Sequence, residues 1–183
     1  MDKRGIRNLG KLLRESGDVE SFGEKAYGFL SELKEYKNAE TIMLYLSLKK
    51  EAPTDELAEK ILADKKRVVV PVTMGREMTL SEITSDTEYK VGGFNVREPI
   101  EIKPFCDKDV DLCIVPGLLF DRKGTRCGYG KGCYDLFLSK VNPVKVGLAF
   151  EVQVIKGFPS EEHDVKMDYI ITEKELINCG KDE

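Results

Sequence analysis

The stretch DLCIVPGLLFDRKGTRCGYGKGCYDLFLSKV, residues 111–141, contains the order of elements that decides the fold. It begins with the apolar run 111–117, which ends in Pro-Gly and predicts a buried strand. It ends with residues 133–141, whose pattern predicts a helix. Between them, residues 121–135 hold four glycines and four cations, namely Arg122, Lys123, Arg126 and Lys131. A strand, a glycine-rich loop and a helix in this order are typical of the ligand-binding edge of an open α/β sheet.

The glycine-rich loop has the composition of an anion-binding site. Gly128, Gly130 and Gly132 alternate along it, which permits close backbone approach and lets successive N–H groups point at one anion. The helix that follows adds the positive end of its dipole. Arg126 and Lys131 supply full charges. Neither the P-loop pattern nor G-x-G-x-x-G is present, so a flexible turn with solvated basic residues remains the alternative.

Apolar segments along the rest of the chain predict alternating helices and strands. Helical spacing of apolar residues covers 3–16, 19–36 and the segment after Pro53. Strands are predicted at 41–48, 67–72, 145–150 and, last in the chain, 168–172, while 73–104 predicts one strand at MTLSEI (78–83) and otherwise turns and loop. Because strands that are apolar throughout alternate with helices, we expect one domain, 1–183, with a mostly parallel sheet covered on both faces.

The composition excludes several classes of protein. The chain has 183 residues, of which 41% are hydrophobic and 34% charged, as in a folded globular protein. Its net charge of −4 disfavours nucleic acid as a partner. Neither a signal-peptide core nor a membrane-spanning segment is visible, so a cytoplasmic protein without a membrane partner is expected. The five cysteines form no C-x-x-C pair, which disfavours a disulfide framework and a structural zinc site.

The chain resembles the 5-formyltetrahydrofolate cyclo-ligase family, also called methenyltetrahydrofolate synthetases. The specific signature is VPGLLFDRKGTRCGYGKGCYDLFL, residues 115–138. Further blocks agree in the same order, namely KRGIR (3–7), YLSLKKEAPT (45–54), GGFNVREP (92–99), GLAFEVQV and HDVKMDYIIT. The resemblance implies a three-layer α/β/α fold with a mostly parallel central sheet, Rossmann-like and of the NagB/RpiA/CoA-transferase type.

The activity that this resemblance implies is an ATP-driven ring closure. Similar enzymes transfer the γ-phosphate of Mg-ATP to the formyl oxygen of 5-formyltetrahydrofolate, and a second folate nitrogen then attacks the formyl carbon. The products are 5,10-methenyltetrahydrofolate, ADP and phosphate, so Mg²⁺ is the implied cofactor and ATP the co-substrate. A glycine cradle with cations and a metal suits phosphoryl transfer, which depends mainly on positioning and charge stabilisation. A monomer and a homodimer both remain open.

The resemblance also assigns site residues, carried over by position. ATP contacts are implied for Lys3, Arg4, Gly5, Ile6, Arg7, Arg126, Cys127, Gly128, Tyr129, Gly130, Lys131, Gly132, Cys133 and Tyr134, with Lys131 and Arg126 as catalytic cations. Folate contacts are implied for Leu46, Glu51 and Tyr134, and Mg²⁺ contacts for Asp135 and Asp164. Taken without the resemblance, these acids are ordinary loop and helix carboxylates, and Lys3 with Arg7 is a solvated basic face.

Two departures from the family pattern concern the folate half of the site. Cys133 precedes Tyr134 where the family usually has two tyrosines, and the chain has no Trp, which some members place near the folate. Cys133 is interpreted as a space-filling residue, because no candidate base lies near it in the sequence. Gln153 lies in a family block without an assigned role, and His163 is interpreted as an exposed loop residue.

Two other functions remain as alternatives. The first is a nucleotide- or sugar-phosphate-binding α/β enzyme with a different acceptor, which predicts ATP binding without folate turnover. The second is a non-catalytic folate-binding protein, which predicts folate binding that does not depend on Mg-ATP.

Overall fold

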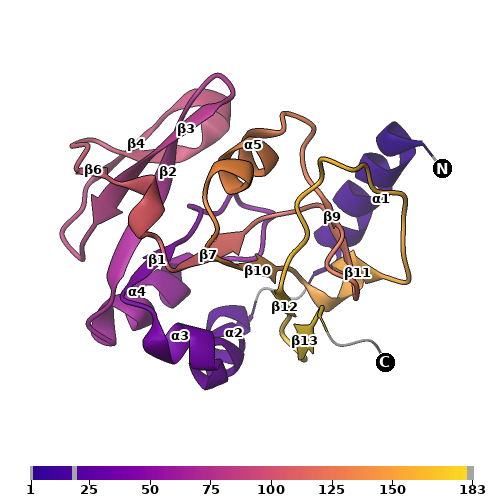
Figure 1. Cartoon of the computed structure of the whole chain (residues 1–183), viewed down its shortest axis with the longest axis horizontal. Coiled ribbons are helices and arrows are strands. Elements are labelled where there is room, and N and C mark those ends of the chain that lie inside the picture. The colour runs from indigo at the N-terminus through magenta and orange to yellow at the C-terminus, as the bar shows by residue number, and fades with distance from the viewer. Residues whose placement is uncertain (1, 18–19, 181–183) are drawn as a thin grey trace.

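A computed structural model describes residues 2–17 and 20–180 (Figure 1). An eight-stranded sheet has the order β13-β12-β10-β7-β1-β2-β3-β6. Its strands are β1 (Thr41–Met43), β2 (Arg67–Met74), β3 (Glu77–Ile83), β6 (Pro104–Phe105), β7 (Leu112–Val115), β10 (Val144–Leu148), β12 (Tyr169–Ile171) and β13 (Leu176–Asn178). The central strands from β12 to β2 pair in parallel, and antiparallel strands lie at both edges.

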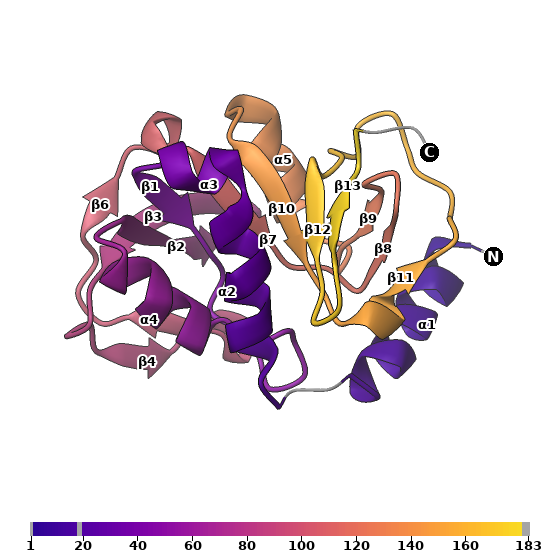
Figure 2. The same ribbon diagram turned by 90° about the horizontal axis from the view of Figure 1, so that it is seen from below.

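Helices cover both faces of this sheet. The α-helices of the described residues are α1 (Lys3–Glu15), α2 (Phe22–Glu32), α3 (Lys34–Asn38), α4 (Asp55–Ala63) and α5 (Cys133–Lys140). Those that pack on the large sheet include α2, α4 and α5. Figure 2 shows α2 and α4 in front of the sheet and α5 behind it. Alternate side chains of a strand point to opposite faces, so Val68 and Val70 of β2 pack in the cluster that includes α2 and α4, whereas Val69 packs in the cluster with Phe137 of α5. The three-layer prediction is confirmed.

Helix α1 lies beside a second, smaller sheet rather than on the large one (Figure 1). That sheet has the order β11-β8-β9 and consists of β8 (Leu119–Asp121), β9 (Arg126–Cys127) and β11 (Val154–Ile155), which follows η3 (Glu151–Gln153). The side chain of Asp2 caps α1 by accepting a hydrogen bond from the Gly5 amide at 2.8 Å. A Cβ on Gly10 would lie only 2.8 Å from Leu118 Cβ, so α1 approaches the β8 segment closely.

Several predicted boundaries are wrong. The predicted helix 19–36 is two helices, because Leu33 has extended backbone with φ −64° and ψ 129° between α2 and α3; residues 18 and 19 lie outside the described ranges. The predicted strand 41–48 is shorter in the structure, where β1 ends at Met43. The strand at 168–172 is not the last, since β13 pairs antiparallel with it.

The segment 73–104 contains more structure than its sequence predicts. Besides β3, it holds β4 (Tyr89–Val91), which pairs antiparallel with β5 (Arg97–Pro99), and the short helix η1 (Gly93–Asn95) between them. The edge strand β6 and the short helix η2 (Asp107–Asp109) follow. These strands are only two or three residues long, so they lack the apolar run that predicts a buried strand.

Two absences expected from composition concern the membrane and the cysteines. In the ranges that the structure describes, no helix has both the length and the apolar character that crossing a bilayer requires. All five cysteines are free thiols.

Candidate functional site

A cavity of about 800 Å³ lies beyond the carboxyl ends of β1, β2 and β7. The chain passes from β1 to its neighbour β2 on one side and later enters β7 on the other side of β1, so the strand order reverses here. Ligands of open α/β sheets bind at such reversal points. Helix α1, the β2–β3 hairpin, η1 and residues 158–164 complete the walls.

Three glycines of the glycine-rich loop, Gly124, Gly130 and Gly132, have positive φ, and the last two shape the part that lines the cavity. Gly130 has φ +99° and Gly132 has φ +68°, backbone angles that residues other than glycine rarely adopt. Gly132 is the N-cap residue of α5, so the loop runs directly into the N-terminus of that helix. A Cβ on Gly130 would lie 3.0 Å from the guanidinium carbon of Arg7. The loop backbone is therefore held between α1 and α5.

Arg126 is the cation that is fixed inside this loop. Its side chain is 4% exposed, and Nη2 pairs with Asp135 Oδ2 at 3.1 Å. Nη1 donates to the carbonyl oxygen of Pro116 at 3.2 Å. The buried Nε of Arg126 has no hydrogen-bond partner. The guanidinium is thus rigidly placed at the cavity wall with an unused donor.

Three further cations around the loop are not neutralised by the protein. Arg7 lies against Gly130, and Nη2 of Arg76 would lie 3.3 Å from a Cβ on Gly132. The ammonium of Lys131 lies over the ring of Phe94. Among residues 2–17 and 20–180, no carboxylate forms an ion pair with any of the three. This excess positive charge, in a chain of net charge −4, favours a polyanionic ligand.

The opposite wall of the cavity presents a buried carboxylate. Glu51 is 8% exposed, and its Oε2 accepts from the Leu48 amide at 2.7 Å. Its Oε1 accepts from the hydroxyl of Tyr129, a residue of the glycine-rich loop. Burial, reinforced by Glu51, raises the pKa of the Tyr129 phenol, which therefore stays protonated and donates. Leu46 is buried beside them and lines the cavity.

The segment 73–104 supplies an apolar wall that sequence reasoning did not assign. Met78, Phe94 and Val96 line the cavity. Phe94 is 71% exposed and has φ +58°, a strained conformation for a bulky residue. An aromatic ring is therefore held at the cavity mouth at an energetic cost. Arg76 comes from the two-residue turn of the β2–β3 hairpin, whose Gly75 has φ +67°.

The carboxylates predicted for Mg²⁺ have different surroundings. Asp164 groups with Glu161 and His163, whose ligand atoms lie within 4.8 Å of one another, and Lys3 reaches Glu161 at 2.6 Å. Asp135 instead accepts from Arg126 and, at 3.2 Å, from the Val165 amide. The hard oxygen donors at 161 and 164 fit Mg²⁺. A metal role for Asp164 and for Asp135 stays a prediction.

Gln153, which had no assigned role, positions the chain behind the site. It is 1% exposed, and its Nε2 donates to the carbonyl oxygens of Gly117 and Leu118, at 3.0 Å each. Its Oε1 accepts from the Phe150 amide at 2.9 Å. Gln153 therefore fixes Gly117 and Leu118, the residues that follow β7 and lead to the glycine-rich loop.

Most predicted site residues line this cavity, and the two that do not are Arg4 and Gly5; Arg122 and Lys123, cations of the glycine-rich loop that were not assigned to the site, also lie elsewhere. Arg4 and Gly5 are absent from its lining, whereas Lys3, Ile6 and Arg7 belong to it. Arg122 pairs with Glu175 instead. Lys123 lines a different cavity. Cys133 lines the cavity and its thiol is 3.8 Å from the Gly75 carbonyl oxygen, which agrees with a packing role.

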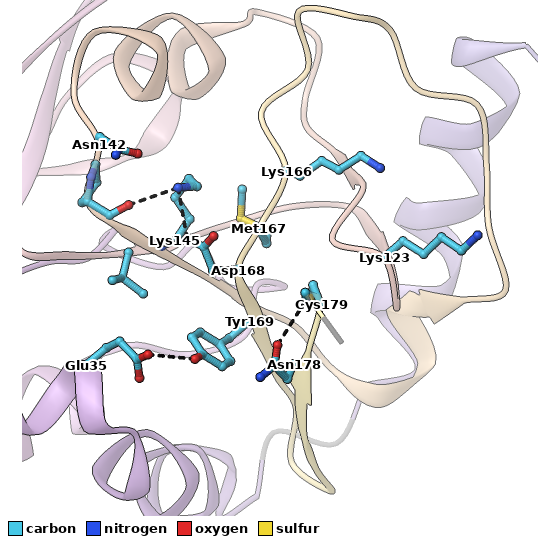
Figure 3. A pocket seen from close by; sticks show the side chains of 13 residues that line it. Glu35, Lys123, Asn142, Lys145, Lys166, Met167, Asp168, Tyr169, Asn178 and Cys179 are labelled. Carbon is cyan, nitrogen blue, oxygen red and sulfur yellow. Dashed lines mark hydrogen bonds and ion pairs between the residues drawn. The ribbon is translucent and has the colours of Figure 1, made fainter. Parts of the chain in front are cut away.

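The cavity that Lys123 lines has a volume of about 490 Å³ and lies at the amino ends of β10 and β12 (Figure 3). Its inner polar groups satisfy one another. Lys145 pairs with Asp168 at 3.0 Å, and the Tyr169 hydroxyl donates to Glu35 at 2.9 Å. Figure 3 shows Lys123 pointing away from these pairs. These polar residues are paired with one another and so have a structural role. The cavity of about 800 Å³ at the carboxyl ends of the strands is therefore the candidate site.

Fold and cavity together define an α/β protein with a glycine-rich loop, surrounded by cations, and a buried carboxylate at the reversal point of a mostly parallel sheet. A model of the 5-formyltetrahydrofolate cyclo-ligase family matches residues 4–173. The chain belongs to this family, and the resemblance found in its sequence is confirmed.

Relatives of this family are similar over three quarters of the chain or more. A probable 5-formyltetrahydrofolate cyclo-ligase of Schizosaccharomyces pombe is 31% identical over 195 aligned positions, covering 95% of each chain. The 5-formyltetrahydrofolate cyclo-ligase of Mus musculus is 30% identical over 158 positions, covering 76% of each. The solution structure of Aquifex aeolicus 5,10-methenyltetrahydrofolate synthetase superimposes with a TM-score of 0.86 and 32% identity, covering 100% of this chain and 95% of that one.

Proposed function

We propose that this chain converts 5-formyltetrahydrofolate to 5,10-methenyltetrahydrofolate with hydrolysis of ATP to ADP and phosphate. The observation that carries the proposal is that one cavity holds uncompensated cations on one wall and a buried carboxylate with apolar neighbours on the other. A reaction between a nucleotide and a neutral heterocycle needs both kinds of surface. Family membership supports the same reaction, because the relatives carry its name.

The loop side suits the polyphosphate of ATP. Amides of residues 128–132 and the N-terminus of α5 can donate to phosphate oxygens. Arg7, Arg76 and Lys131 bring positive charge that no described carboxylate neutralises. The ammonium of Lys131 ends a long, flexible side chain, so we assign it to the transferred phosphoryl group. The fixed guanidinium of Arg126 is assigned to stabilising the negative charge of the phosphates.

The carboxylate side suits the pterin ring. A pterin carries adjacent N–H donors on a flat ring, and a fixed carboxylate can accept them. Glu51 is held by the Leu48 amide and Tyr129, so its oxygens are already oriented. Leu46, Tyr134 and Phe94 offer apolar and aromatic surface nearby.

Mg²⁺ would be held by the carboxylates of Asp164 and Glu161. When bound, it would neutralise charge on the phosphates of ATP and orient them. Lys3, paired with Glu161 at 2.6 Å, lies between this cluster and the loop and would bind the same phosphates.

The proposed chemistry has two bond exchanges. The formyl oxygen attacks the γ-phosphorus of ATP and the bond to ADP breaks, giving a phosphorylated formyl group. The second folate nitrogen then attacks the formyl carbon and loses its proton, and the carbon–oxygen bond breaks. Phosphate leaves with the former formyl oxygen. In both exchanges the residues of the cavity hold the reacting atoms together and stabilise the phosphate charge, which is the main source of rate in phosphoryl transfer.

The test is an absorbance assay with purified protein, Mg-ATP and 5-formyltetrahydrofolate, following the methenyl product in the near ultraviolet. We expect growth of absorbance that requires ATP. Tight ATP binding without product would favour an enzyme with another acceptor. Folate binding that is independent of Mg-ATP, again without product, would favour a binding protein.

A further inference from the structure

Helix α1 carries a third cation on the face that meets the cavity. Arg14 follows Arg7 by seven residues and Lys3 by eleven, and both intervals return to nearly the same side of a helix. Lys3 and Arg7 line the cavity directly, whereas Arg14 lies behind its wall. Gly10, on the same helix, lets α1 approach Leu118 closely. The helix therefore lies close to the segment that leads to the glycine-rich loop.

The guanidinium of Arg14 joins the two halves of the site. Its Nη1 donates to the Tyr129 hydroxyl, and that hydroxyl donates to Oε1 of Glu51. Nη1 also lies 4.0 Å from the same oxygen of Glu51. The guanidinium carbon is 5.5 Å from the centroid of the Tyr129 ring. Three segments distant in sequence, α1, the loop after β1 and the glycine-rich loop, therefore meet at one carboxylate.

The charges at this junction require one another. The side chains of Arg14 and Glu51 are 10% and 8% exposed, and a buried charge without a counter-ion is strongly disfavoured. The Nε of Arg14 is itself buried without a hydrogen-bond partner, so the side chain forgoes a solvated position to reach Glu51. Such an unmet donor costs free energy. A surface residue that served only helix α1 would not need this arrangement.

We propose that Arg14 is a positioning residue for the folate substrate, acting through Tyr129 and Glu51. This inference rests on the proposed function. Arg14 compensates the negative charge of Glu51 and holds it as an oriented acceptor for the pterin donors.

The first variant to compare with the wild type is Arg14→Met, which keeps the stem and removes the charge. We expect KM for 5-formyltetrahydrofolate to rise about ten-fold or more, as for loss of a charged hydrogen-bond partner, with KM for ATP changed less than about two-fold. Arg14→Lys restores the charge and should recover part of the affinity. Lys11→Met is the matched control, because Lys11 is exposed on the same helix and should leave both KM values unchanged.

A double-mutant comparison separates positioning from folding. In a Glu51→Gln background, Arg14→Met should change KM for the folate little further, since the charge on which Arg14 acts is gone. Additive effects of the two substitutions would overturn the proposal, as would equal rises in both KM values. Should Arg14→Met unfold, Tyr129→Phe removes the bridging hydroxyl with little change of volume and must raise the same KM. Wild-type protein without ATP-dependent turnover would overturn the proposed function and this inference together, whereas active wild type with an unchanged Arg14→Met would overturn this inference alone.

Discussion

Arg126 of β9 and Asp135 of α5 form an ion pair at 3.1 Å across the glycines 128, 130 and 132 that lie between them. The second oxygen of Asp135 accepts from the Val165 amide at 3.2 Å, so the pair also holds the segment that carries Asp164. Their side chains are 4% and 23% exposed, which limits screening by water. These contacts of Asp135 therefore tie the glycine-rich loop, helix α5 and the Val165 segment together.

Replacing Asp135 tests these contacts. Asp135→Asn leaves the Arg126 guanidinium without its counter-ion, so we expect the free energy of unfolding to fall by about 1–3 kcal/mol. Urea unfolding measures the loss, and Asp164→Asn, which breaks no ion pair with Arg126, should be nearly neutral.

A magnesium titration of turnover on both variants locates the metal. A raised requirement in Asp164→Asn is expected, and an unchanged titration in Asp135→Asn would remove Asp135 from the metal site.

Replacing Lys131 tests the cation assigned to the transferred phosphate. Lys131→Ala should lower kcat/KM by about a hundred-fold, while the free energy of unfolding changes by less than about 0.5 kcal/mol, as for a surface substitution. The control is Lys123→Ala, because Lys123 lies at the other cavity. Wild-type kinetics in Lys131→Ala would contradict its role.

Adding one methyl group to the loop tests its backbone geometry. Gly130→Ala places a Cβ at φ +99° and 3.0 Å from Arg7, so we expect a loss of about 1–2 kcal/mol of stability and a higher KM for ATP. Gly28→Ala is the opposite control. Gly28 lies within α2 with nothing within 4 Å of the added Cβ, so alanine should stabilise the helix. Thermal unfolding and ATP titration distinguish the two variants.

The raised pKa of Tyr129 predicts a dependence on alkaline pH. Burial raises the pKa of this phenol above the ordinary value of about 10. The folded state therefore keeps a proton that the unfolded state releases, so the contribution to stability is complete below pH 10 and decreases as pH rises further. Urea unfolding at about pH 8 and about pH 10.5 should show this decrease, and it should be smaller in Tyr129→Phe. An identical decrease in the variant would contradict the assignment.

The parts of the site that lie together in the sequence were predictable from it. Residues 126–134 combine glycines with cations between a buried strand and a helix, so their local chemistry already indicates the loop. The strands at β2 and β7 are apolar runs, because both faces of these strands are covered. Their position between helices then predicts where the loop lies in the sheet.

The parts assembled by tertiary packing were not predictable in the same way. Phe94 comes from the short helix η1 and Arg76 from a two-residue hairpin turn, and such short segments carry no periodic signal. Arg14 had a signal, its seven-residue spacing from Arg7, but a charged helix face is usually solvated. Its partners Tyr129 and Glu51 lie 115 and 37 residues away in sequence. Only the folded chain shows that one carboxylate joins them.

In the proposed reaction, ATP phosphorylates the formyl oxygen before the ring closes. The most direct measurement uses 5-formyltetrahydrofolate labelled with heavy oxygen in the formyl group and follows the label by mass spectrometry of the released phosphate. We predict that each phosphate carries the formyl oxygen, formed together with methenyl product and ADP. Unlabelled phosphate, with the heavy oxygen released as water, would contradict the account.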